Sequence, residues 1–198
     1  MGTDMDGVIE SRRADGRWRM EFDLLDFSPP RDYVAWDCLF GVRGTGDVER
    51  PLFADRGLPD DVSDPVREAA FGDGQHGHTH LSWADAGAVD WDEPLASRPA
   101  WYWTHRSDPG GEHLVRVTPT LRTAAGELFG GGGLLLAPPE WPPGAEVHLD
   151  GAVYRPVVLT ARMLAPPDEG CWAEVWGAMR HLAADHGDEH VRLTVWFG

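Results

Sequence analysis

Carboxylates recur at alternate positions near the start of the sequence, at Asp4, Asp6 and Glu10. In an extended chain, residues of the same parity point to one side, so a strand here would place all three carboxylates on one face. Three like charges on one face need a bound cation or contact with solvent. These positions are therefore candidate ligands or bases. The alternative is a solvated chain end on which the carboxylates have no further role.

A second candidate set consists of three alternating histidines, His76, His78 and His80. Imidazole nitrogens at strand spacing can bind one metal ion, and a carboxylate from elsewhere can complete the coordination sphere. The surrounding glycines make a solvated loop the better interpretation for His76, whereas His78 and His80 are predicted ligands. Together with Asp4 they would form a mixed nitrogen and oxygen site, which suits Zn²⁺, Mn²⁺ or Fe²⁺.

Other residues are assigned roles around this predicted metal site. Asp6 or Glu10 would act as the catalytic base or as a further ligand. Arg56 is expected to orient an anionic group of a substrate, and Trp83 to contact the substrate, because ligand sites combine aromatic walls with a few polar groups.

The segment Asp4-Met5-Asp6-Gly7 also resembles the nucleophile motif of haloacid-dehalogenase-type phosphatases. In that fold the motif follows a buried strand of about five apolar residues, at the carboxyl end of an open α/β sheet. Only Met1-Gly2-Thr3 precede Asp4. The sequence context therefore argues against this reading.

The composition limits the class of partner. The formal net charge is −16 at pH 7, and no arginine-rich stripe offsets it, which disfavours nucleic acid. A cation or a basic protein suits this charge better, although an acidic surface can also serve solubility alone. Cys38 and Cys171 fall within helical apolar patterns and are predicted to be reduced thiols. No signal peptide or spanning segment is recognised, so a cytoplasmic location is expected.

Local signals predict the secondary structure. Asp15-Gly16 predicts a hairpin from 7–13 and 17–23, and Asp150-Gly151 a second one from 147–149 and 153–159. Apolar spacing and caps predict the helices, at 31–40, from Ser63 or Asp64, from Ser82, and at 172–186. Residues 191–197 are predicted to form a closing strand.

These elements do not alternate as βαβ units, so we expect an α+β fold with a mostly antiparallel sheet packed against several helices. Residues 1–198 are expected to form a single domain. The segment at about 93–144 is rich in Gly, Pro and Trp, with a possible strand at 113–118, and is predicted to be an irregular insertion. Its aromatic residues are candidates for a substrate pocket or for the core, and they are Trp91, Trp101, Tyr102, Trp103 and Trp141.

Several short pieces together resemble a family of uncharacterised bacterial and phage proteins. The matching pieces are Met1 to Asp6, Arg31-Asp32-Tyr33, Gly41-Val42-Arg43, Arg56 to Asp60, His78-Thr79-His80 and Val191 to Phe197. The resemblance covers about the first 90 residues and the last 30. It implies that these positions matter, without implying a reaction. Asp6 stands where the family usually has His, a change that exchanges nitrogen for oxygen at a possible ligand.

The sequence therefore supports two hypotheses of different classes. The first is a metal-assisted hydrolase of a small polar or anionic substrate, in which Asp4, His78 and His80 hold a divalent metal that activates water. The second is an acidic partner-binding protein, toxin-neutralising or phage-related, without catalysis.

Overall fold

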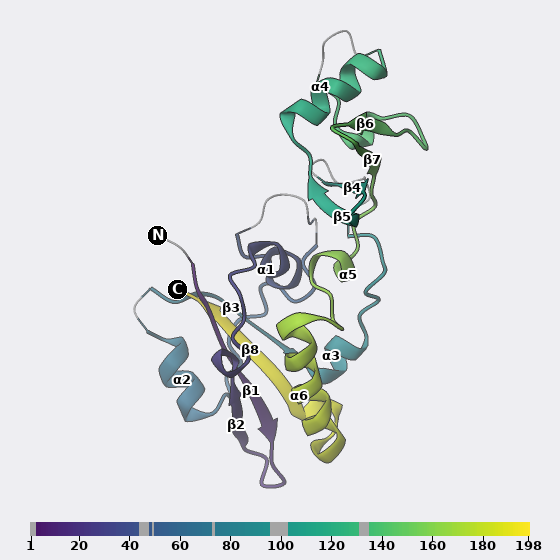
Figure 1. Ribbon diagram of the computed structural model, residues 1–198. Coiled ribbons are helices and arrows are strands. Elements are labelled where there is room, and N and C mark those ends of the chain that lie inside the picture. The colour runs from purple at the N-terminus through teal and green to yellow at the C-terminus, as the bar shows by residue number, and fades with distance from the viewer. Residues whose placement is uncertain (1–2, 44–47, 49, 73, 96–102, 131–134) are drawn as a thin grey trace.

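The computed structural model describes residues 3–43, 48, 50–72, 74–95, 103–130 and 135–198. Within these residues the chain forms two antiparallel sheets of four strands each and six α-helices (Figure 1). The predicted α+β class is confirmed.

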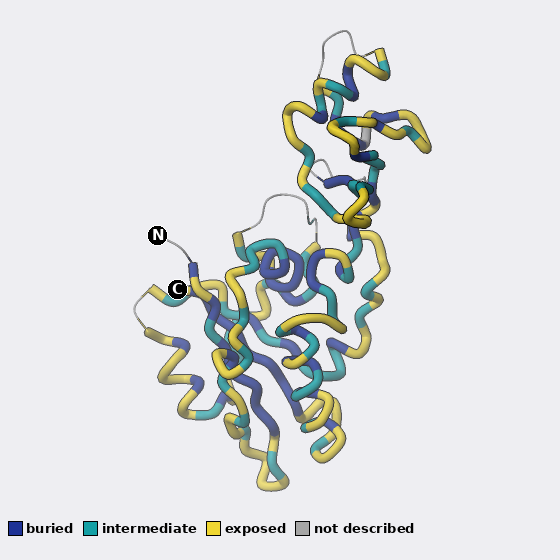
Figure 2. The backbone as a smooth tube through the Cα atoms, viewed as in Figure 1, coloured by how far each residue is buried: buried dark blue, intermediate teal, exposed yellow. Residues whose placement is uncertain are grey.

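The first sheet brings together segments that lie far apart in the sequence. Its strands are β1 (Met5–Arg12), β2 (Trp18–Asp23), β3 (His76–Ser82) and β8 (Val191–Phe197), in the order β2-β1-β8-β3. The predicted turn joins β1 to β2 through residues 13–17, where Arg13 N donates to Arg17 O and Gly16 has a φ of 81°. A glycine adopts this left-handed conformation without strain. The buried centre of the sheet is β8, all of whose residues are buried (Figure 2).

Helices cover both faces of this sheet (Figure 1). The larger layer contains α1 (Tyr33–Phe40), α3 (Trp83–Gly87), α5 (Ala161–Leu164) and α6 (Gly170–His186). On the opposite face α2 (Asp64–Ala70) packs Val66 and Ala70 against Val8 and Trp196. We refer to these as the α6 face and the α2 face of the sheet. Successive residues of a strand point to opposite faces of the sheet. Trp196 packs against α2, so Asp6, which lies opposite Trp196, also points to the α2 face. The same alternation places Glu10 and Arg192, which lie opposite each other, on the α2 face.

Caps explain where the predicted helices begin and end. The Asp32 carboxylate accepts hydrogen bonds from the backbone N–H groups of Val34 and Ala35, and Gly41 ends α1 in the left-handed conformation. Ser82 and Asp85 form the predicted capping box of α3. Short 3-10 turns complete the set, at Leu24–Phe27 (η1), Pro138–Glu140 (η2) and Asp188–His190 (η3).

The prediction of an irregular insertion at 93–144 is wrong for most of its described part. This segment contributes β4 (Trp103–Asp108), β5 (Gly111–Arg116) and α4 (Pro119–Leu128). With the hairpin of β6 (Val147–Leu149) and β7 (Ala152–Pro156) it forms the second sheet, ordered β5-β4-β7-β6. An apolar cluster formed by α4, Trp141 and Val147 gives this region a core of its own.

The second predicted hairpin is confirmed. Asp150 and Gly151 both have positive φ values, of 51° and 76°, which is the combination required by a type I′ turn. The strand after the turn ends at Pro156 and does not reach residue 159 as predicted. Over the described residues, no helix has the length and apolar character needed to cross a membrane.

Candidate functional site

Asp4 lies beside the end of β8, exposed and paired with an arginine. Its backbone exchanges two hydrogen bonds with Gly198, and its carboxylate accepts from Arg31 Nε at 2.6 Å and Nη2 at 2.7 Å. The hydrogen bonds and charge of Arg31 hold the pKa of Asp4 below its ordinary value. Both carboxylate oxygens are thus already used by a neighbouring cation.

The two histidines lie on β3, on the other side of β8 from Asp4. His78 Nε2 is 2.7 Å from the carbonyl oxygen of Ala70, and His80 Nδ1 is 3.0 Å from that of Gly57. Since β8 separates β3 from the segment of Asp4, the two backbones are two strand spacings apart, roughly 10 Å.

The arrangement does not fit the predicted metal site. Ligand atoms of one zinc ion lie within about 2.0–2.2 Å of it. Here Asp4 faces Arg31, while each histidine directs one ring nitrogen at a backbone carbonyl. Among the residues that the structure describes, no group of three or more His, Cys, Asp or Glu side chains is placed to hold a metal ion. The structure thus does not bring Asp4, His78 and His80 together.

Asp6 differs from Asp4 because it lines a hollow of about 320 Å³ on the α2 face. The hollow lies between β1, the end of β2 and α2, and its other lining residues include Asp23, Gln75 and Trp196. Burial, together with the negative charges of Asp23 and Asp4, raises the pKa of the Asp6 carboxyl above its ordinary value. A carboxyl group with a raised pKa beside a second carboxylate is a common feature of acid–base sites.

Glu10, the other predicted base, is fully buried in an ion-pair network. Its carboxylate accepts from Arg192 Nε at 2.9 Å and from the backbone N–H of Ser63 at 2.8 Å. Arg192 Nη1 also donates to Asp61 at 2.6 Å, and its guanidinium carbon stacks 3.8 Å from the ring centroid of Trp18. A side chain enclosed in this way cannot meet a substrate. Glu10 therefore has a structural role, and its assignment as a base is corrected.

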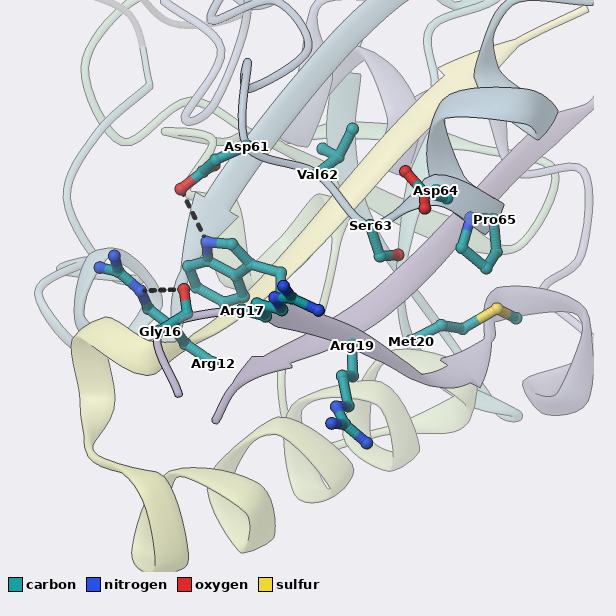
Figure 3. A pocket seen from close by; sticks show the side chains of 11 residues that line it. Arg12, Gly16, Arg17, Arg19, Met20, Asp61, Val62, Ser63, Asp64 and Pro65 are labelled. Carbon is teal, nitrogen blue, oxygen red and sulfur yellow. Dashed lines mark hydrogen bonds between the residues drawn. The ribbon is translucent and has the colours of Figure 1, made fainter. Parts of the chain in front are cut away.

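A larger hollow of about 740 Å³ adjoins the Asp6 hollow, and Met20 and Pro65 line both. One wall is the β1–β2 hairpin with Arg17 and Arg19, and the other is the segment that leads into α2 (Figure 3). Trp18 Nε1 donates to Asp61 at 2.8 Å between the two walls. The arginines of this hollow, Arg12, Arg17 and Arg19, lie beside the carboxylates of Asp61 and Asp64, so groups of both charges adjoin the Asp6 hollow.

The two predicted substrate contacts, Arg56 and Trp83, lie apart from the Asp6 hollow. Arg56 donates to Asp85 at 2.7 Å and lies over the ring of Phe53, so a carboxylate already balances its charge. Trp83 is half-buried at the start of α3 and lines a hollow between α3 and α6, on the α6 face. Neither residue lines the Asp6 hollow.

The remaining predicted aromatic contacts are divided between core and surface. Trp103 and Trp141 are buried, whereas Trp91 lines the same hollow as Trp83. Trp101 and Tyr102 lie outside the described residues. Both cysteines are free thiols, as predicted. Burial, aided by the charge of Asp37, raises the pKa of the Cys38 thiol to about 12, so this thiol remains protonated and is no nucleophile.

Sequence reasoning missed three residues of this region, Asp23, Gln75 and Arg192. The first two enter the site only through folding and carry no local signal. Arg192 does carry one, because an arginine in an otherwise apolar strand must meet a buried carboxylate. Comparison of the chain with family models, curated proteins and solved structures found no match.

Proposed function

We propose that the chain is a hydrolase of a small polar or anionic substrate, with Asp6 as the general base. The observation that carries this proposal is the position of Asp6 in a hollow where burial and two neighbouring carboxylates raise its pKa. A base is most effective when its pKa approaches the working pH, because it then binds a proton strongly while remaining ionised.

The surroundings support this role. Asp23 is held in place as the N-cap of η1, where its carboxylate accepts from Leu25 N at 2.9 Å. Arg12 and Arg17 in the adjoining hollow supply positive charge for an anionic substrate, whereas Arg19 is already paired with Asp15 at 3.6 Å. In the reaction, Asp6 takes a proton from water as the water oxygen attacks, and the leaving group receives that proton when its bond breaks. We expect this chemistry in the cytoplasm, where free thiols such as those of this chain stay reduced.

The test is hydrolysis of a panel of phosphomonoesters, carboxylic esters and amides by the wild type and by Asp6→Asn. We expect one class to be hydrolysed and the variant to lose about 10²–10⁴-fold in kcat. The wild-type rate should rise as pH increases through the raised pKa of Asp6, because the ionised form is the base. Asp6→Asn should lack this limb of the profile.

Asp23→Asn is the matched control. Asparagine caps a helix as well as aspartate does, so η1 should persist. Removing the neighbouring charge should move the ascending limb to lower pH while kcat is retained. Equal activity of the wild type and Asp6→Asn on the hydrolysed substrate would contradict the proposal.

Protein binding without catalysis is the second candidate function, favoured by the free edge of the first sheet. In the described part of the chain, β2 has no strand partner on its outer side, and Met20, Phe22 and Leu25 are exposed along and just beyond it. Such an edge can pair with an extended segment of another protein. Absence of turnover on the whole panel, together with a basic protein that binds the wild type and not Phe22→Asp, would favour this function instead.

A further inference from the structure

A second hollow, of about 390 Å³, lies between α3 and α6. It is on the α6 face of the first sheet, whereas Asp6 is on the α2 face, so the two sites are separate. Three indole rings contribute to its walls, those of Trp83, Trp91 and Trp176. Its volume falls within the range of small-molecule sites, about 300–1,000 Å³, and such sites are typically lined by aromatic side chains with a few polar groups.

The helix α6 supplies one wall in a fixed orientation. Ala173, Trp176 and Arg180 line the hollow, and their spacing of three and then four residues places them on one side of the helix. The Trp176 ring is held between two others, stacked on Trp172 with centroids 5.4 Å apart and tilted against Trp91 at 6.2 Å. The wall is therefore organised before any ligand arrives.

Trp176 also carries an unused hydrogen-bond donor. Its side chain is buried, and its indole N–H meets no acceptor in the part of the chain that the structure describes. A buried donor without a partner destabilises the folded state. Because this nitrogen is enclosed by protein atoms, it is not a contact for a ligand in the hollow.

Of the two arginines that line the hollow, one is available to an anion. Arg162 donates to Asp92 at 2.9 Å and to Asp168 at 2.6 Å, so its charge is balanced. For Arg180, which is exposed, the described residues provide no ion pair. Its guanidinium is thus available to a carboxylate.

We propose that this hollow binds a small planar aromatic molecule that carries a carboxylate or a similar anionic group. The aromatic ring packs against the indoles of Trp83 and Trp91, at the 4.5–7 Å centroid separations that such pairs prefer. The anionic group pairs with Arg180. The site goes beyond the proposed hydrolase and does not depend on it.

The probe is naphthoate, with its neutral analogue naphthalenemethanol, measured by calorimetry on the full chain. The buffer contains about 0.15 M salt, because the net charge of −16 repels anions at long range and this salt reduces the Debye length to about 8 Å. We expect one saturable site, with a shift of one or more indole N–H signals in the nitrogen-proton NMR spectrum.

Two variants test separately the contact with the anionic group and the location of the site. Arg180→Gln should weaken naphthoate binding about tenfold and leave naphthalenemethanol binding unchanged, since only the anion meets the guanidinium. Gly87→Leu should weaken both probes. Gly87 lines the hollow, and a Cβ added there meets no atom within 4 Å, so the larger residue occupies open space without disturbing the backbone.

Matched controls lie outside the hollow. Arg67→Gln removes an equal charge from an exposed arginine of α2, and Thr123→Leu adds the same side chain at an exposed position of α4. Both should bind both probes as the wild type does, and thermal melts should show all four variants folded. Absence of saturable binding in the wild type, or full binding by Gly87→Leu, would overturn the site. An equal effect of Arg180→Gln on both probes would overturn its anionic specificity.

Discussion

On the α6 face of the first sheet, β8 presents Leu193, Val195 and Phe197 to a large apolar core, and on the α2 face it presents Arg192, Thr194 and Trp196. The larger layer of helices makes the first face a packed interior. On the second face the short α2 covers only part of the strands, and polar groups fill the remainder. Two hollows open beside it as a result. Within one strand, alternate residues therefore serve stability on one side and leave chemistry possible on the other.

Breaking the buried ion pair on the α2 face should have the largest effect on stability. Arg192→Met leaves the carboxylate of Glu10, which is fully buried, without its cation. We expect the free energy of unfolding to fall by about 3–5 kcal/mol, measured by urea denaturation. Replacing both members with Glu10→Leu and Arg192→Met should recover part of this loss. A loss below about 1 kcal/mol in the single variant would show that water reaches Glu10.

Leu193, the neighbour of Arg192 in β8, tests the packing on the α6 face. Leu193→Ala removes a fully buried side chain from the core beneath α6 and should cost about 3 kcal/mol, through lost burial and the cavity that remains. The same denaturation experiment measures it, and the slope against urea concentration should stay that of the wild type. A cost as small as that of a surface substitution would mean that the helix layer closes over the cavity.

The smallest effect, with the opposite sign, is expected at Thr194. Its hydroxyl is buried and, among the described residues, has no hydrogen-bond partner. Thr194→Val keeps the shape and removes the unpaired group, so stability should stay equal or rise by up to about 1 kcal/mol. A measurable loss of stability would reveal a hydrogen bond to this hydroxyl, and the contrast between the faces would then be less sharp.

Sequence patterns predicted the elements whose signals are local. The Asp15-Gly16 and Asp150-Gly151 turns, the Ser82 capping box and the apolar stripe of α6 each depend on residues close together in the chain, and each is confirmed. The strand β4 was missed, and β5 was predicted only as a possible strand at 113–118, because their side chains are mostly only partly buried, which weakens the alternation of polar and apolar residues. Asp108-Pro109-Gly110-Gly111 between them was a usable turn signal, and Asp108 does accept from Gly110 N.

The candidate site was predicted less well than the fold. The alternation of side chains along an extended strand correctly placed Asp6 and Glu10 on one face. It could not show that Arg192 encloses Glu10, or that β8 lies between Asp4 and the histidines, since both facts depend on the order of strands. The spacing of residues along one segment predicts which side chains share a face of a strand. A metal site also depends on the distance between different segments, which this spacing does not give.

The central position of β8 has a consequence for how the molecule acquires its structure. During synthesis β1, β2 and β3 all leave the ribosome before β8, which pairs with both β1 and β3 in the finished sheet. Until then the inner edges of β1 and β3 are unpaired, because their partner β8 lies more than 100 residues further along the chain. Folding that depends on such distant pairings is slow, and exposed strand edges attract other chains. We therefore expect the nascent chain to need protection by chaperones until β8 emerges.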